Sequence, residues 1–248
     1  MKFNPLNIFL RRHQVNNNLE SRKYSDFTRF EEDIYHWVRP YTMTSPERVK
    51  ALINSIEYII KNDIRGDFVE CGVWKGGSVM TIAKILLKHG ISDRKIWLYD
   101  TFEGMTEPEE IDRDMNGKSA KERLINEDKY NSRAWGYSTI EEVKHNVSLT
   151  DYPLSNIIFV KGKVEETLLK DNLPEKISFL RLDTDWYKST KIQLEVLYPL
   201  VIRNGFILID DYGHWEGCQK AVDDFLRELK FPPFLNRIDY TGRLLIKN

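Results

Sequence analysis

The order of strand-like and helix-like segments constrains the fold of this chain more than any other feature. Short apolar runs alternate with segments of helical periodicity, which is typical of a parallel sheet covered by helices. The expected strands are 67–71, 95–99, 157–160, 177–182 and 205–209, and the expected helices are 46–61, 78–88, 189–201 and 217–229. A short turn at 241–242 joins two further runs, 237–240 and 243–246, as an antiparallel hairpin. The sequence therefore predicts an α/β fold with a mostly parallel sheet, helices on both faces and an antiparallel C-terminal edge hairpin.

The length of 248 residues, with 41% hydrophobic and 30% charged residues, fits one large α/β domain. A helix should begin at Pro46, because Ser45 is a good N-cap and proline suits the first helical position. We interpret residues 1–45 as an N-terminal arm or lid and residues 46–248 as the main domain. The polar stretch 104–146 is too long for an ordinary connection, which favours a lid over a site, although a plain surface excursion is the alternative.

Composition and charge disfavour several classes of protein. The formal net charge of -1 gives no basic field for nucleic acid, and no apolar run approaches the roughly 20 residues of a membrane span. Cys71 and Cys218 have neither metal-type nor redox-type spacing, and the first ten residues do not read as a secretory signal. We expect a cytoplasmic protein with reduced thiols and no nucleic-acid or membrane partner; a homo-oligomer is possible.

Four carboxylates follow two of the expected strands. Asp183 and Asp185 come after 177–182, and Asp210 and Asp211 come after 205–209. Carboxyl ends of strands in an open α/β sheet are where ligands bind, so these acids should converge on one crevice. Converging acids need a cation, a shared proton or a basic partner, and an all-oxygen ligand set suits a hard divalent ion such as Mg²⁺.

A structural role is the alternative for these acids. Asp185 could cap the helix expected from residue 189. Asp210 or Asp211 could instead be held in a structural ion pair by one of three nearby basic residues, Arg181, Lys188 or Lys191.

A glycine-rich turn, ECGVWKGGS at 70–78, connects the first strand to its helix. Gly72, Gly76 and Gly77 permit positive φ and close approach of a ligand, and the helix that begins at Ser78 offers N–H groups to an anion. This spacing is neither G-x-G-x-x-G nor a phosphate loop, which argues against NAD and ATP. Glu70, at the strand end, could receive a cationic group such as an ammonium.

Asp100 ends the second strand, a position that commonly accepts hydrogen bonds from ribose hydroxyls. Together, Glu70 and Asp100 match the two ends of a nucleoside that carries an amino acid, and S-adenosylmethionine is that molecule. The alternative is that both acids only cap turns or pair with Lys75 and Arg94.

Four motifs resemble the macrocin O-methyltransferase (TylF) family. They are VECGVWKGGS at 69–78, YDTFEGM at 99–105, LRLDTDWYKST at 180–190 and GFILIDDYG at 205–213, and YTMTSPER at 41–48 adds to the likeness. The resemblance covers the chain from about Tyr35 to the C-terminus. It implies a Rossmann-like class I methyltransferase fold, S-adenosylmethionine as the methyl donor, and Mg²⁺-dependent methylation of a sugar hydroxyl, typically on a natural product.

Carried over position by position, the resemblance makes Asp183, Asp210 and Asp211 the metal ligands and Asp185 the general base. Three carboxylates would leave Mg²⁺ room for water and two neighbouring hydroxyls. Coordination lowers the pKa of the reacting hydroxyl, whose proton a base can then take. His214 is an alternative base or a substrate contact.

Further contacts to the methyl donor are expected from three parts of the chain. Met43, with Tyr41 and Thr42, belongs to a block that would border the donor, and Thr101 follows Asp100. Ser138 and Gly162 are candidate adenine-side contacts. Three aromatic residues beside the acids could stack on a sugar or simply pack, namely Trp186, Tyr187 and Tyr212.

Two other functions remain open from the sequence. A catechol-like O-methyltransferase would use the same donor and metal, because two adjacent phenolic oxygens chelate the ion equally well. A non-catalytic nucleoside-binding or nucleotide-sugar-binding protein would only hold a metal with these acids. A small glycoside, a nucleotide sugar and a saccharide precursor of a surface polysaccharide are all candidate acceptors.

Overall fold

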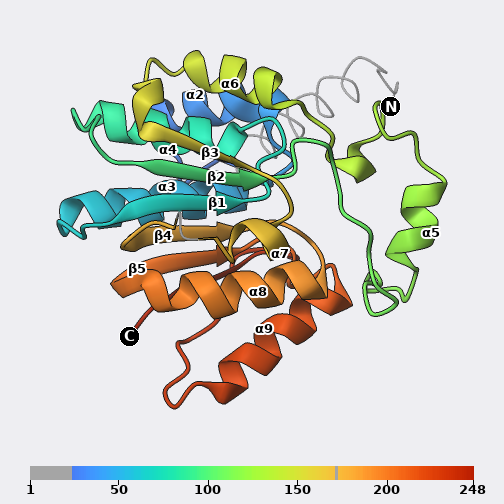
Figure 1. The fold of residues 1–248 in the computed structure, drawn as a ribbon. Coiled ribbons are helices and arrows are strands. Elements are labelled where there is room, and N and C mark those ends of the chain that lie inside the picture. Colours follow the sequence, from blue (N-terminus) through green and yellow to red (C-terminus); the bar gives the residue numbers. More distant parts are fainter. Residues whose placement is uncertain (1–23, 171–172) are drawn as a thin grey trace, which may run out of the picture.

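The structure is a computed structural model that describes residues 24–170 and 173–248. One sheet forms its centre (Figure 1). Within these residues the sheet has seven strands in the order β3-β2-β1-β4-β5-β7-β6. The strands are β1 (Asp67–Cys71), β2 (Ile96–Asp100), β3 (Ile157–Lys161), β4 (Ile177–Leu182), β5 (Val201–Ile209), β6 (Asn236–Arg237) and β7 (Arg243–Ile246). The first five pair in parallel, and β7 pairs antiparallel with both β5 and β6. This confirms the predicted mostly parallel sheet with an antiparallel C-terminal edge.

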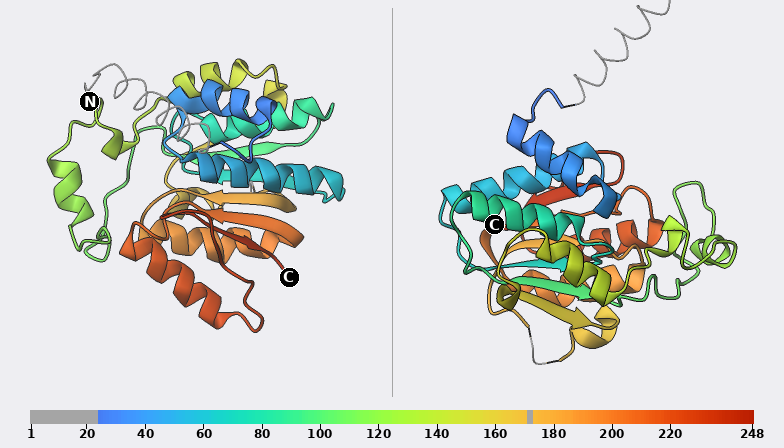
Figure 2. Two further views of the ribbon diagram at one scale, coloured as in Figure 1. Left: turned by 180° about the vertical axis from the view of Figure 1, so that it is seen from behind. Right: turned by 90° about the horizontal axis from the view of Figure 1, so that it is seen from above.

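Helices cover both faces of the sheet, as Figure 2 shows from two further directions. One face carries α2 (Arg29–Val38), α3 (Pro46–Lys61), α4 (Gly77–Lys88) and α6 (Ile140–Ser148), and the other carries α7 (Val164–Thr167), α8 (Tyr187–Leu197) and α9 (Glu216–Glu228). Helix α5 (Ala120–Ile125) lies away from the sheet. Short 3₁₀ turns are η1 (Arg39–Tyr41), η2 (Arg133–Trp135), η3 (Leu154–Asn156) and η4 (Tyr198–Leu200).

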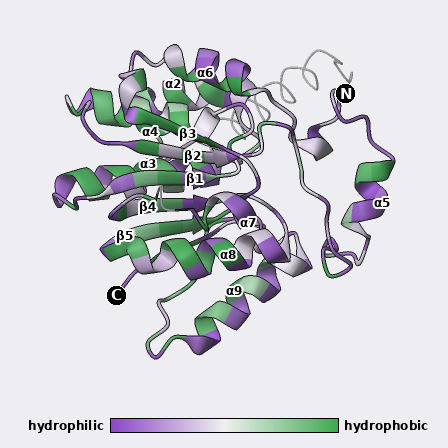
Figure 3. Cartoon of the chain, viewed as in Figure 1, coloured by the Kyte–Doolittle hydropathy of each residue, from purple (hydrophilic) through white to green (hydrophobic). Residues whose placement is uncertain are grey.

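The strands bury side chains on both faces because successive residues point in opposite directions. Phe68 and Phe179 belong to the core under α3 and α4, whereas Val69 and Leu180, one residue further along each strand, belong to the core under α8 and α9. Strands covered on both faces are rich in apolar residues, which made them visible in the sequence, and Figure 3 shows hydrophobic segments along the strands between hydrophilic ones. Each fully buried side chain of this size stabilises the fold by about 1.5–3 kcal/mol.

Helix α2 is not among the elements predicted from the sequence. Thr28 caps its first turn reciprocally with Glu31, and Ile34, Tyr35 and Val38 are buried against the core. The part of the expected arm that the structure describes, 24–45, therefore packs on the main domain. Residues 1–23 lie outside the described part of the chain, so the division at residue 45 stays a prediction.

Most predicted elements keep their boundaries, but β6 covers only Asn236–Arg237 instead of 237–240, so the connection to β7 is longer than the predicted turn at 241–242. Helix α3 begins at Pro46 with Ser45 as its N-cap, as predicted. Helix α8 ends at Leu197 instead of continuing to residue 201, because Pro199 in η4 lacks the amide that a helix needs. Strand β5 consequently begins at Val201, four residues earlier than expected.

The predicted insertion is held at its base. The amide of Met105 donates to the carbonyl of Trp135 at 2.9 Å, so the two ends of the segment 105–135 lie together. From residue 140 onward the chain belongs to α6, whose Val143 and Val147 are buried in the core. The insertion is therefore the segment 105–135, which is shorter than the predicted 104–146, and its role as a lid remains a prediction.

The insertion is also hydrogen-bonded to the starts of α8 and α9. The indole of Trp186 donates to the Thr106 carbonyl at 3.1 Å, and the amide of Tyr187 donates to the buried carboxylate of Asp112 at 2.8 Å. Two backbone bonds add to these, from Glu216 to Arg113 and from Met115 to His214. The first part of the insertion thus positions the two loops that carry the acids.

Both cysteines are buried free thiols. Among the described residues, no helix is long and apolar enough to cross a membrane.

Candidate active site

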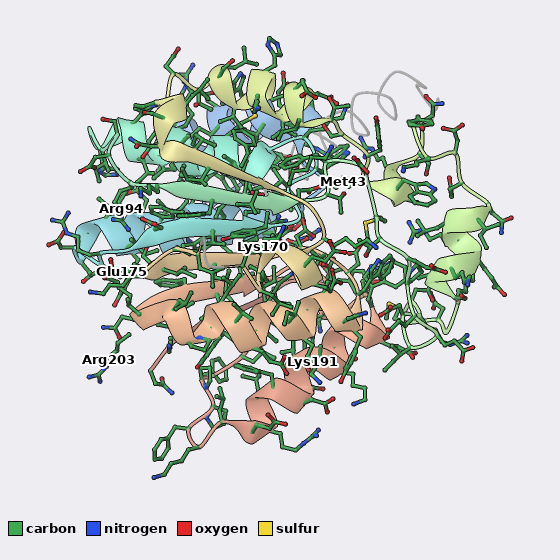
Figure 4. All side chains as sticks on the ribbon, in the orientation of Figure 1. Met43, Arg94, Lys170, Glu175, Lys191 and Arg203 are labelled. Atoms are coloured by element: carbon green, nitrogen blue, oxygen red, sulfur yellow. The ribbon has the colours of Figure 1, made fainter. Side chains whose placement is uncertain are left out.

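A cavity of about 470 Å³ opens at the carboxyl ends of the strands. In Figure 4, Met43 lies on the side that faces the insertion, whereas Arg94, Glu175 and Arg203 mark the opposite end of the sheet. The structure brings most predicted site residues to the cavity wall: Asp183, Asp185, Asp210, Asp211, His214, Gly72, Gly77, Ser78, Asp100, Thr101, Met43 and Gly162. Three others do not line it, namely Glu70, Gly76 and Ser138.

The glycine turn is shaped by close backbone contacts. Gly72 has φ +83°, and a Cβ atom there would lie 1.8 Å from the carbonyl oxygen of Asp183. At Gly77 a Cβ would lie 2.6 Å from the Tyr41 carbonyl, which brings 41–44 against the start of α4. The N-cap of α4 is Gly76, which supplies no side-chain cap, so the first amides of this helix remain available to a ligand.

Asp100 binds the same turn from the end of β2. Its carboxylate accepts hydrogen bonds from the amides of Val73 at 2.6 Å, Trp74 at 3.2 Å and Phe102 at 2.7 Å. Burial raises the pKa of Asp100 despite these donors. Asp100 therefore caps the turn, as the structural alternative proposed, and also reaches the cavity. Its contact with a ribose stays a prediction.

Glu70 lies below the cavity wall in contact with Arg181. Both side chains are buried, and Nη1 of Arg181 is 2.5 Å from Oε1 of Glu70. Burial, partly offset by the attraction of Arg181, raises the pKa of Glu70 to about 7. Its second oxygen, Oε2, is buried without a hydrogen-bond partner among the described residues. Neither Lys75 nor Arg94 pairs with it.

Asp210 is held by two arginines. Arg181, on β4, lies 2.7 Å from Asp210 and 2.7 Å from Asp183, and Arg48, on α3, contacts Asp210 and also Asp239 at 3.0 Å. The structural ion pair with Arg181 that the sequence left open is therefore present for Asp210. Its predicted role as a metal ligand stays untested, but its carboxylate already has two cationic partners.

Asp183, Asp185 and Asp211 form the group best able to hold a cation. One carboxylate oxygen from each lies within 4.8 Å of the others. Burial and mutual repulsion raise the pKa of Asp183 and of Asp211 well above the usual range, and burial raises the pKa of Asp185 to about 7. Such a set fits a hard divalent cation, which would compensate the charges that burial disfavours. It differs from the predicted ligand set by Asp185 in place of Asp210.

Asp185 does not cap α8. The amide of Tyr187 is bound by Asp112, and Asp185 instead has φ +64°, a conformation that costs a non-glycine residue about 1–3 kcal/mol. Its amide donates to Oδ2 of Asp211 at 3.2 Å, which joins the two acid loops. Strained residues of this kind cluster at functional sites.

His214 lines the cavity next to the acids. Its Nδ1 lies 2.5 Å from the hydroxyl of Tyr240, on the turn between β6 and β7. Burial, together with the positive charge of Arg123, lowers the pKa of His214 below its usual value. The imidazole is therefore neutral near pH 7 and able to accept a proton.

Several cavity residues were missed from the sequence. Arg48 carries a signal that could have revealed it, because a basic residue in the first turn of a helix opposes the helix dipole. Arg123 and Trp215 carry no such local signal. None of the three aromatic candidates, Trp186, Tyr187 and Tyr212, lines the cavity, and Trp186 packs edge-on against Trp215 at 5.0 Å between ring centroids.

Comparisons with known proteins agree with this geometry. A family model described as Macrocin-O-methyltransferase (TylF) matches residues 3–247. Demethyldecarbamoylnovobiocin O-methyltransferase from Streptomyces niveus is 31% identical over 202 residues, which cover 82% of this chain and 74% of that protein. The 8-demethyl-8-(2,3-dimethoxy-alpha-L-rhamnosyl)-tetracenomycin-C 4'-O-methyltransferase from Streptomyces olivaceus is 30% identical over 203 residues, with 82% and 74% covered.

Among solved structures, that of the O-methyltransferase NovP superposes with a TM-score of 0.72. It is 28% identical in sequence, and the match covers 84% of this chain and 82% of NovP. The match over residues 3–247 and the two relatives show that this chain belongs to the macrocin O-methyltransferase (TylF) family of S-adenosylmethionine-dependent O-methyltransferases.

Proposed function

We propose that this enzyme methylates a hydroxyl group of a sugar, with S-adenosylmethionine as methyl donor and Mg²⁺ as an essential ion. The observation that carries the proposal is the convergence of Asp183, Asp185 and Asp211 in a cavity that also contains the glycine turn. The name of the Streptomyces olivaceus relative gives a rhamnosyl-bearing substrate and the 4'-oxygen as its methylation site, which supports a sugar acceptor.

The donor would lie along the glycine turn, between Gly72 and Ser78, with Asp100 at its ribose end. The free amides at the start of α4 suit its carboxylate. The buried, unpartnered oxygen of Glu70 would suit its ammonium group. Positions 41–44, including Met43, lie between η1 and α3 and would close the donor side. Contacts of Ser138 and Gly162 with adenine remain predictions.

Asp183, Asp185 and Asp211 would hold Mg²⁺, and Arg48 and Arg181 would fix Asp210 beside them. When bound, Mg²⁺ supplies Lewis-acid chemistry that lowers the pKa of an acceptor hydroxyl. A carboxylate engaged with a cation is a poor base, so the three-acid geometry favours His214 over Asp185 as the proton acceptor. Tyr240 would orient the imidazole through Nδ1.

In the reaction, the acceptor hydroxyl gives its proton to the imidazole and its oxygen forms a bond to the methyl carbon of the donor. The carbon–sulfur bond breaks, its electron pair stays on sulfur, and S-adenosylhomocysteine leaves. No covalent enzyme intermediate is needed, and the protein contributes orientation and charge stabilisation.

The test has two stages. Titration calorimetry should detect S-adenosylhomocysteine binding and no NAD binding, and Mg²⁺ should bind in a way that chelator reverses. A methyl-transfer assay on matched panels of glycosides and catechols then separates the candidate acceptors. Transfer to catechols alone would contradict the sugar acceptor, and donor binding without any transfer would favour a non-catalytic binding protein. His214→Gln and Asp185→Asn should both lose transfer, but only Asp185→Asn should weaken Mg²⁺ binding.

Three further properties stay predictions that these experiments do not address: a cytoplasmic location, the absence of nucleic-acid partners, and assembly into a homo-oligomer.

A further inference from the structure

The arginines that line the cavity fall into two groups. Arg48 and Arg181 come from the main domain and are engaged by acids, whereas Arg123 and Arg133 come from the insertion. Across residues 24–170 and 173–248, neither insertion arginine forms an ion pair with a carboxylate. The insertion thus brings to the cavity two arginines that lack an ion-pair partner in the described structure.

Arg123 is positioned at the reacting end of the cavity. Its guanidinium lies over the ring of Trp215 at 5.7 Å from the centroid, and Trp215 is itself buried and lines the cavity. His214, the residue before Trp215, also lines the cavity. Arg123 therefore faces the acceptor side, beside the acids, and its contact with Trp215 orients it.

An arginine in this situation is well suited to an anionic group. Its planar guanidinium presents five donors in a fork that matches phosphate and carboxylate oxygens, often in pairs. A cavity with three clustered acids would otherwise repel an anionic substrate, so a positive group at the acceptor side changes which acceptors the site can attract.

We propose that the acceptor is a saccharide carrying a phosphate or carboxylate group, and that Arg123 binds this anionic group while the acids hold the sugar hydroxyl. Arg133 adds positive charge to the same wall. This inference rests on the proposed sugar O-methyltransferase function and names the acceptor class within it. A phosphate would come from a sugar phosphate or nucleotide sugar, and a carboxylate from a uronic acid.

The experiment measures probe binding to the full-length protein loaded with S-adenosylhomocysteine and Mg²⁺. The probes are uridine diphosphate glucose, glucose 1-phosphate, methyl glucuronide and neutral methyl glucoside. At least one charged probe should bind about tenfold or more tightly than methyl glucoside, because a charge-assisted hydrogen bond contributes on that scale. The two phosphate probes and the glucuronide distinguish the two sources of negative charge.

Three variants make the assignment specific. Arg123→Gln should weaken the favoured charged probe about tenfold to a hundredfold while the affinities for methyl glucoside and S-adenosylhomocysteine stay unchanged. Arg123→Lys should retain part of the preference. Lys121→Gln is the matched control, because Lys121 is a basic residue of the same helix that pairs with Glu107 outside the cavity. It should leave every affinity unchanged.

The proposal is overturned if no charged probe binds more tightly than methyl glucoside, or if Arg123→Gln leaves the preference intact. If the wild-type protein did not bind S-adenosylhomocysteine at all, the proposed function itself would be overturned. Failure of the anionic-acceptor proposal and failure of the proposed function are therefore distinguishable.

Discussion

Two neighbouring parts of the same sheet edge are held together by different forces. The glycine turn after β1 is fixed by volume, since backbone atoms of Asp183 and Tyr41 occupy the space that side chains at Gly72 and Gly77 would need. The acid loops after β4 and β5 are fixed by charge, since Arg48 and Arg181 hold Asp210 while three other acids are clustered. The donor side should therefore be sensitive to added atoms, and the acid side to removed charges.

The largest effect is expected from Gly72→Ala. The added Cβ would overlap the Asp183 carbonyl at 1.8 Å, and neither backbone can move without separating β1 from β4. The free energy of unfolding should fall by more than about 4 kcal/mol, or folded protein should not be recovered. Urea unfolding measures this.

Gly90→Ala is the control for Gly72→Ala. Gly90 also has positive φ, +68°, but no atom lies within 4 Å of its added Cβ. It should cost only about 1–2 kcal/mol, the penalty for the left-handed conformation. If the two variants lost the same free energy of unfolding, the positive φ alone, and not the steric overlap at Gly72, would explain the loss.

Asp210→Asn should be the most destabilising change among the acids of the two acid loops. It removes the charge that Arg48 and Arg181 share, and breaking a buried ion pair on one side costs about 3–5 kcal/mol. Thermal and urea unfolding of the metal-free protein would measure the loss. An unchanged midpoint would mean that the two arginines find other partners and that charge does not fix this loop.

The pH dependence of stability should change in Glu70→Gln. A glutamate in the unfolded chain has a pKa of 4.5, whereas burial raises the pKa of Glu70 to about 7 in the fold, because burial disfavours its charge. Between these values the unfolded chain has released a proton that the folded protein keeps, so the free energy of unfolding falls as pH rises from about 5 to about 7. Glutamine cannot titrate, so over this pH range the free energy of unfolding should fall by about 1–3 kcal/mol less in the variant than in wild type.

Urea unfolding of wild type and Glu70→Gln at pH 5, 6, 7 and 8 tests this, with the difference between the two curves as the readout. Parallel curves would show that Arg181 keeps Glu70 ionised throughout, in which case attraction outweighs burial at this position.

Asp211→Asn should have the opposite sign from Asp210→Asn. Burial and repulsion raise the pKa of Asp211, so removing its charge should stabilise the metal-free protein. The same variant should lose both methyl transfer and the stabilisation that wild type gains from Mg²⁺. Destabilisation of the metal-free variant would contradict the view that these acids are held together at a cost.

The smallest effect is expected from Asp112→Ala. Asp112 caps the first turn of α8 through the Tyr187 amide, and loss of a cap costs about 0.5–2 kcal/mol. Methyl transfer should fall more than S-adenosylhomocysteine affinity, because the affected loop carries Asp183 and Asp185 rather than the glycine turn. Equal losses of methyl transfer and of S-adenosylhomocysteine affinity would mean that the insertion supports the glycine turn as well as the acid loops.

The sequence predicted the parts of the molecule that depend on local pattern. Short apolar runs between helical segments located the five parallel strands. The prediction that residues at strand ends, such as Asp100 and Asp183, line one cavity was also correct. Helix α2 was missed although Thr28 and Glu31 form a capping box, because its apolar stripe is short and set in a polar segment.

What the sequence could not provide was the pairing of charges across distant segments. Asp210 and Asp211 are adjacent and look equivalent, yet one faces Arg48, far away on α3, and the other faces Asp185. Likewise, nothing local to Arg123 indicates that it lies over Trp215. These contacts depend on how the helices pack on the sheet, and the hydrophobic periodicity of the sequence does not predict that packing.

The closed base of the insertion bears on how such enzymes diversify. Because the Met105 amide bonds to the Trp135 carbonyl, the intervening chain leaves and rejoins the domain at nearly one point. A replacement of any length that preserves this junction leaves the spacing of β2 and α6 unchanged, since loop length adds little to the closure entropy. Recombination at this junction would exchange Arg123 and Arg133 together, and the acid loops keep their support only where the replacement retains residues that, like Asp112 and Arg113, bond to the starts of α8 and α9.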